Sequence, residues 1–234
     1  MRILAIDTTT EACSAALLLG DSRISRTEEP GRGHADRILK MVDEILSEGG
    51  VALSALDAIA ACIGPGAFTG VRICIATAQG LAFGAGLKVV PVVSLEALAF
   101  ARMRSGASRV LACLDARMNE VYWACYLADP ERGLRAGAGP ALSSPSQVKL
   151  PADALEPAGA YAAVGRGFSA YPQLLQLVAP GSDAGDLRLL PDARAVAELG
   201  ALRARAGEAI DPDALKPLYL RDNVALTEAQ RGVH

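Results

Sequence analysis

The sequence predicts an α/β fold in which helices pack on a mixed β-sheet. Short polar turns separate two apolar strands, at residues 3–6 and 13–19, and a possible third strand at 23–28. Strands joined so closely must run antiparallel. A strand at 58–63, an apolar helix at 70–85 and a β-branched strand at 88–93 then follow one another, which implies a parallel crossover. The two kinds of connection together predict a mixed sheet.

Composition narrows the class of protein. The chain has 234 residues, enough for one large domain or two small ones, and its formal net charge of −3 argues against a free-standing nucleic-acid-binding protein. Its five cysteines lie in apolar segments without a C-x-x-C pair, as expected for buried thiols in a reducing compartment. No signal peptide is evident, and the apolar run between Arg72 and Lys88 is shorter than the ~20 residues that span a membrane. We expect a cytoplasmic protein with no membrane segment.

The remainder of the first half predicts two more helices. Residues 35–46 place apolar side chains at helical spacing, which predicts an amphipathic helix. A second helix, with a cap at its start, is predicted from Ser94 to about Arg102. A polar break at 104–108 then divides the chain, and the predicted domains are residues 1–104 and 105–234.

The second half begins as the first does. Strands at 110–115 and 121–127, joined by a polar turn, repeat the pattern of the opening hairpin. One hairpin resembling another leaves duplication open, because hairpins are common. Residues 129–156 predict loops with at most one strand and a short helix. The other predicted elements are a strand at 161–164, helices at 171–178 and 192–206, and an extended segment at 212–220.

The stretch 64–73 and the helix that follows it, to about Ala85, organise the chain. Glycines and a proline open the stretch as a turn, and Thr69 is the predicted N-cap. The stretch is neither a P-loop nor a dinucleotide-binding fingerprint, because its spacing fits neither. The helix is apolar nearly all round, and Ala76, Gly80 and Gly84 recur every four residues as a smooth flank. This pattern fits a central core helix or a helix with one face for a partner.

Residues suited to catalysis are few. Neither histidine has a second ligand at metal-binding spacing, so no metal site is predicted. Asp7 and Asp115 end strands at corresponding places, where a carboxylate could hold a metal–nucleotide or cap its own turn. A helix N-terminus attracts anions. The candidate nucleotide or anion contacts are therefore Asp7, Thr8, Thr9, Gly66 and Thr69.

Several segments resemble the TsaB (YeaZ) family. They are residues 3–10 with 13–17, 33–39, 64–73, 115–117 with 120–122, and 217–221. Gly-Pro-Gly-x-Phe-Thr-Gly-x-Arg, from Gly64, is the most specific motif. The chain departs from the family at Thr9 and Ala67, where serine is commoner, and residues 129–160 match no motif. The resemblance implies the actin-like ATPase (ASKHA) fold, with two duplicated subdomains, each a mixed sheet flanked by helices.

The resemblance also implies a role in making threonylcarbamoyladenosine (t6A). In that system a sibling of the same fold, TsaD, transfers the threonylcarbamoyl group to the adenosine next to the anticodon in tRNAs that read codons beginning with A. TsaD holds a metal through a His-x-x-x-His pair. Here the residue four after His34 is Ile38, so the resemblance implies a non-catalytic partner. It implies no intrinsic cofactor, and it allows ATP or ADP at the partner junction.

The family pairs with TsaD, and with itself, through helices of its N-terminal lobe. The resemblance therefore implies TsaD and a second copy as partners, the small ATPase TsaE as a third member, and tRNA contact only through the complex. The implied interface residues are Asp36, Arg37, Lys40, Arg72, Ile73, Ala76, Gly80 and Phe83. Two other readings stay open. An independent ATPase or kinase would need nucleotide in its own cleft, yet the turn 8–11 lacks the glycine that lets phosphates approach. A peptidase would need an activated nucleophile.

Overall fold

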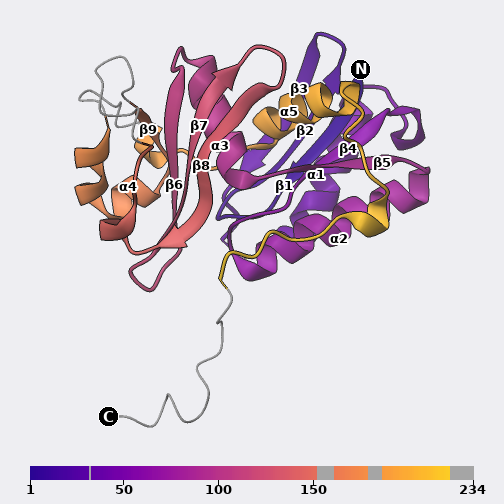
Figure 1. Cartoon of the computed structure of the whole chain (residues 1–234). Helices are drawn as coiled ribbons and strands as arrows, with labels where there is room; N and C mark the ends of the chain where they lie inside the picture. The colour runs from indigo at the N-terminus through magenta and orange to yellow at the C-terminus, as the bar shows by residue number, and fades with distance from the viewer. Residues whose placement is uncertain (32, 152–160, 179–185, 222–234) are drawn as a thin grey trace.

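A computed structural model describes residues 1–31, 33–151, 161–178 and 186–221, which form two lobes, each built on one sheet (Figure 1). The first lobe has strands in the order β3-β2-β1-β4-β5. Their bounds are β1 Arg2–Asp7, β2 Cys13–Leu19, β3 Ser22–Glu28, β4 Ala58–Cys62 and β5 Lys88–Val92. β1 pairs antiparallel with β2 and parallel with β4, so the predicted mixed sheet is confirmed.

The second lobe repeats this plan. Its strands are β6 Arg109–Asp115, β7 Val121–Asp129, β8 Gly133–Ser143 and β9 Ala162–Val164, in the order β8-β7-β6-β9. β6 pairs antiparallel with β7 and parallel with β9, as β1 does with β2 and β4. The repeated topology supports duplication of one subdomain. β8 is the single strand allowed for residues 129–156, of which 152–156 lie outside the described residues.

Helices cover both sheets, and the two halves of the chain exchange one helix each. α1 (His34–Glu48) and α2 (Phe68–Ala85) pack on one side of the first sheet, and α5 (Ala193–Arg205) packs across the other (Figure 1). α3 (Ser94–Arg104) instead packs on the second sheet and on α5. The predicted division after residue 104 falls between α3 and β6. Helices α3 and α5 pack across this division and connect the two lobes.

The remaining helices are short. α4 spans Gly167–Ala170, and the 3₁₀ helices are η1 Leu53–Ala55, η2 Pro145–Gln147, η5 Pro172–Leu177, η6 Asp186–Arg188 and η7 Pro212–Ala214. The helix predicted at 171–178 is thus a 3₁₀ helix. After α5 the chain returns along α2 through residues 212–221, which we call the strap (Figure 1). The strap opens with η7, so the extended segment predicted at 212–220 begins only after Ala214.

The start of α2 corrects one prediction. The N-cap is Ala67 and the helix begins at Phe68, so Thr69 lies inside the first turn and does not cap it. By length and composition alone α2 could cross a membrane. The core helix of a soluble protein has the same properties, and one side of α2 packs on β4 and β1.

Candidate functional site

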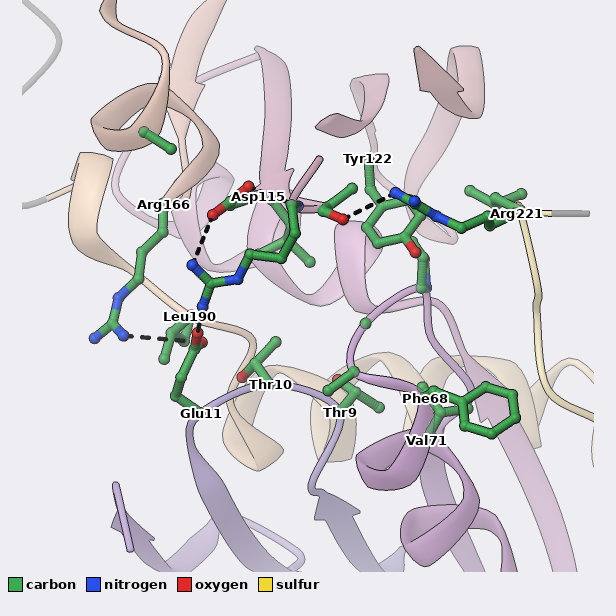
Figure 2. Close-up of a pocket in the computed structure, with 18 of the residues that line it drawn as sticks. Thr9, Thr10, Glu11, Phe68, Val71, Asp115, Tyr122, Arg166, Leu190 and Arg221 are labelled. Carbon is green, nitrogen blue, oxygen red and sulfur yellow. Dashed lines mark hydrogen bonds and ion pairs between the residues drawn. The ribbon is translucent and has the colours of Figure 1, made fainter. Parts of the chain in front are cut away.

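A pocket with a volume of about 940 Å³ lies between the lobes (Figure 2). The first lobe supplies the loop after β1 and the start of α2, the second supplies the β6–β7 turn and α4, and the strap forms one side. Of the five predicted nucleotide or anion contacts, Thr9 and Gly66 line this pocket. Asp7 and Thr8 are buried behind it, and Thr69 is exposed on α2 outside its lining.

Asp7 caps its own turn. Its Oδ1 accepts hydrogen bonds from the backbone N–H and the hydroxyl of Thr9, both at 2.7 Å. The Thr9 hydroxyl lies 3.0 Å from that of Ser94 in the same buried cluster. Burial raises the pKa of the Asp7 carboxyl, although the bonds from Thr9 and the nearby Cys62 thiol lower it. In the second lobe, Asp115 caps its turn similarly, through the backbone N–H of Arg117 at 2.8 Å, but it lines the pocket.

The loop after β1 docks directly on the turn before α2. The Ala67 N–H donates to the Thr9 carbonyl oxygen at 2.7 Å, and the Thr8 hydroxyl donates to the Gly70 carbonyl at 2.7 Å. A Cβ at Gly66 or Gly70 would lie closer than 3.0 Å to the carbonyl oxygen of Thr9 or Thr8. These contacts use the N–H groups of Thr9 and Ala67 within the chain. Those two N–H groups are therefore not available to a phosphate.

Ion pairs cross the pocket between the lobes. Arg117 of the second lobe pairs with Asp115 at 3.1 Å and reaches Glu11 of the first lobe at 3.2 Å. Arg166 pairs with Glu29 of the first lobe at 2.6 Å (Figure 2 shows Arg166 and Glu11 facing each other). The pocket therefore places arginines beside carboxylates, and these pairs neutralise much of its positive charge.

The described residues show neither a metal-binding cluster nor an activated thiol among the four cysteines with raised pKa values. No group of three His, Cys, Asp or Glu residues among the described positions could hold a metal ion. Burial raises the pKa of Cys13 to about 11, and it raises the pKa values of Cys62, Cys74 and Cys113 as well. Such thiols stay protonated near neutral pH and do not act as nucleophiles.

The eight predicted interface residues lie on α1 and α2. Exposed side chains or glycine positions are found at Asp36, Lys40, Arg72, Ala76, Gly80 and Phe83. Arg37 and Ile73 are half-buried, and the Arg37 guanidinium pairs with Glu28 and Glu44, both at 2.6 Å. Their role in binding stays a prediction.

α2 is covered on one side only, which excludes a helix buried all round. Buried residues such as Cys74, Ala78 and Ala82 face the protein, whereas the flank with Ala76, Gly80 and Gly84 is exposed. Phe83 beside it is 63% exposed. A contiguous exposed apolar patch, unlike a single exposed side chain, is typical of a contact surface, and use of this flank by a partner stays a prediction.

Sequence reasoning missed three residues on this surface. Leu39 on α1 is 53% exposed, although its spacing assigned it to the buried face, and Phe68 at the start of α2 is 48% exposed. Tyr219 of the strap stacks on Phe68 with ring centroids 5.7 Å apart. The motif at 217–221 singled out Tyr219, but its place beside α2 was not evident.

We expect the Asp7→Asn variant to fold and to gain stability relative to wild type as pH rises. The folded wild type holds the Asp7 proton to higher pH than the unfolded chain, whose carboxyl titrates near 3.8. Stabilisation by that proton is complete below the unfolded pKa and is lost as pH rises through the folded pKa. Asparagine stays neutral and keeps an acceptor for Thr9. Urea unfolding from about pH 4 to about pH 8 measures the effect, and a pH-independent difference would contradict it.

Comparison with known proteins agrees with this fold. The family model described as tRNA N6-adenosine threonylcarbamoyltransferase (TsaD) matches residues 22–229. The chain is 42% identical over 232 residues to the tRNA threonylcarbamoyladenosine biosynthesis protein TsaB of Escherichia coli, covering 96% of each chain. It is 38% identical to TsaB of Haemophilus influenzae, covering 96% of this chain and 95% of the relative.

Similar solved structures point to the same family. A solved structure titled YeaZ from Pseudomonas aeruginosa superimposes with a TM-score of 0.84 at 41% identity, covering 94% of this chain and 99% of that one. A second Pseudomonas aeruginosa structure, described as an uncharacterized protein with similarity to peptidase YEAZ, gives a TM-score of 0.87 at 42% identity, with the same coverage. The identity over nearly the whole chain, the matching fold and the family model together show that this chain belongs to the TsaB (YeaZ) family.

Proposed function

We propose that this chain is a non-catalytic partner of a TsaD-type transferase. It binds that enzyme and activates it to transfer the threonylcarbamoyl group to the adenosine next to the anticodon in tRNAs that read codons beginning with A. The names of the relatives from Escherichia coli and Haemophilus influenzae assign those proteins to tRNA threonylcarbamoyladenosine biosynthesis. Membership of their family supports the same pathway here, and with it a cytoplasmic location.

Two exposed glycines in the middle and last turn of α2 carry the proposal. Gly80 and Gly84 have ordinary helical backbone, and a Cβ at either would meet no atom within 4 Å. The chain's own packing therefore does not require glycine there, although each glycine costs the helix about 1 kcal/mol relative to alanine. A smooth exposed flank lets a partner helix approach the backbone closely. The cost to the free chain is understandable if a partner covers this flank.

The lack of a metal-binding cluster among the described residues, the cysteine pKa values and the bonded loop after β1 support a role as a partner without catalysis of its own. The described residues hold no metal-binding cluster, and the cysteines with raised pKa values are protonated. A peptidase would need an activated nucleophile, which these protonated cysteines do not supply. The loop that would approach a phosphate is instead bonded to the turn before α2.

The same flank suits other members of the complex that we propose. A second copy of this chain would dock on α1 and α2 in the absence of the transferase, so homodimer and heterodimer compete. TsaE and ATP or ADP would bind at the junction with the transferase, and tRNA would be reached only through the complex. This chain then needs no cofactor within its own lobes.

One observation favours a second function. The pocket of about 940 Å³ lies between two lobes of an actin-like fold, where an independent ATPase or kinase would bind nucleotide. The buried Asp7 and the bonded turn argue against it, but the experiment should measure both activities.

The test is threonylcarbamoyl transfer to tRNA by purified TsaD and TsaE, supplied with threonylcarbamoyl-adenylate, with and without this protein. We expect transfer to appear only when the protein is added. ATP hydrolysis by the protein alone serves as the control and should stay at background. Unchanged transfer together with robust hydrolysis by the protein alone would replace this proposal with the ATPase or kinase.

A further inference from the structure

The exposed flank of α2 extends beyond its small residues. Counting back four residues at a time from Gly84 and Gly80 through Ala76 leads to Arg72 and Phe68, and all five positions are exposed. Residues four apart are neighbours on a helix, but each is turned about 40° round the axis from the one before, so these five form one row that winds round the exposed side. The row has no side chains at one end and two large ones at the other. A partner helix that crosses the row at the glycines would approach closely there, and its contact would continue towards Arg72.

At its large end the row joins the strap. The rings of Phe68 and Tyr219 stack at 5.7 Å, and the Arg72 guanidinium lies 3.8 Å from the centre of the Phe68 ring. Arg72 Nε also donates a hydrogen bond to the Tyr219 hydroxyl at 2.9 Å. Phe68 and Tyr219 remain 48% and 43% exposed. Each side chain is already held by the other two, so a partner would lose little entropy in ordering them.

The strap is fixed to both lobes, so Tyr219 is not a loose end. Gln79 of α2 donates to the Pro212 carbonyl at 2.8 Å, and the Leu218 N–H donates to the Ile63 carbonyl at 2.8 Å. Beyond Tyr219, Arg221 pairs with Glu120 of the second lobe at 2.7 Å. The strap thus connects the α2 flank to the β6–β7 turn.

The β6–β7 turn adds another exposed apolar side chain. Met118 is 75% exposed, and its sulfur lies 2.8 Å from Nη1 of Arg221. Its φ of 55° is in the left-handed region that methionine rarely adopts. Aromatic residues, methionine and arginine are the types enriched at the centres of protein interfaces.

We propose that Phe68, Arg72 and Tyr219, continued by Met118, form one end of the surface that binds the TsaD-type partner, which therefore contacts both lobes. This inference rests on the proposed function. The partner chemistry is an aliphatic helix along the glycines with an acidic side chain near Arg72. Among the described residues, Arg72 Nε donates to the Tyr219 hydroxyl, and the two Nη groups of the guanidinium would face that charge. A protein is favoured over RNA because the nearby arginines at the pocket are already paired with carboxylates.

The test compares affinity for purified TsaD by calorimetric titration. Tyr219→Ala should weaken binding by at least about tenfold, as expected for an interface aromatic. Met118→Asp is the variant whose fold is safest, because the side chain is mostly in water and aspartate tolerates positive φ; it should weaken binding by roughly fivefold or more. Leu175→Asp, at a 38% exposed site in the second lobe, is the matched control and should bind like wild type.

The outcomes separate this inference from the proposed function. Weakened binding by both variants, with unchanged melting and a normal control, supports the inference. Wild-type affinity for Tyr219→Ala and Met118→Asp, in an assay where wild type binds, overturns the inference and leaves the proposed function standing. Absence of binding by wild type overturns both. If the variants bind TsaD normally but the complex loses affinity for tRNA, the surface contacts RNA and the inference is wrong.

Discussion

Replacing Gly80 by aspartate is expected to abolish binding to the TsaD-type partner while the free chain stays folded. No atom lies within 4 Å of the Cβ position at Gly80, so the free chain has room for the new side chain. In the proposed complex the carboxylate would be buried without a partner, which costs about 3–5 kcal/mol and lowers affinity roughly a hundredfold or more. We expect the same of Ala76→Asp, which stands on the same exposed flank. Calorimetric titration with TsaD and the transfer assay measure the two consequences.

Gly80→Ala is the matched control for this prediction. It adds a methyl group without charge, and the higher helix propensity of alanine should raise the free energy of unfolding by about 1 kcal/mol. The methyl group would still push a closely approaching helix away, so binding should weaken, though less than with aspartate. A variant that melts higher yet binds more weakly would separate the needs of the interface from those of the fold. Folded Gly80→Asp and Ala76→Asp proteins that bind TsaD at wild-type strength would exclude this flank as the interface.

Gly70→Ala is expected to be strongly destabilising, although it adds only one methyl group. Its Cβ would lie closer than 3.0 Å to the carbonyl oxygen of Thr8, which is buried backbone and cannot move aside easily. Forcing the loop and α2 apart also strains the hydrogen bond from the Thr8 hydroxyl to the Gly70 carbonyl. We expect a loss of about 3 kcal/mol in the free energy of unfolding, or roughly 6–12 °C in Tm.

Gly84→Ala makes the same chemical change in the same helix, where no atom lies within 4 Å of the new Cβ. It should leave Tm unchanged or raise it slightly, because alanine favours the helix. Thermal unfolding followed by circular dichroism compares the two variants directly. Equal melting temperatures for Gly70→Ala and wild type would show that the loop does not depend on this close approach.

Periodicity predicted most of the regular elements, because strand and helix patterns depend on near neighbours in sequence. The opening hairpin, the crossover through α2 and the paired hairpin of the second lobe are present as predicted. Spacing was less successful at individual positions. Leu39 has helical spacing for burial yet is exposed, since the sheet beneath α1 determines which part of its apolar face is covered.

The candidate site was only partly predictable. The smooth flank of α2 is visible in sequence, as is the lack of a metal-binding pair, because both depend on residue types at fixed spacing. Thr69 was wrongly predicted as the N-cap, because the glycine-rich turn allows the helix to begin two residues earlier, at Phe68. Nothing in the segment around Asp7 indicates that it is buried, because its cover comes from the turn before α2.

The sequence by itself determined the α/β class, the repeated hairpins and the family, because these are written in local patterns and specific motifs. Only the tertiary structure decided that α3 and α5 pack across the division between the halves, that the loop after β1 is bonded to the α2 turn, and that Tyr219 joins Arg72. Each of these contacts joins segments far apart in the chain. Their partners are selected by the shape of the assembled lobes, for which short-range periodicity carries no signal.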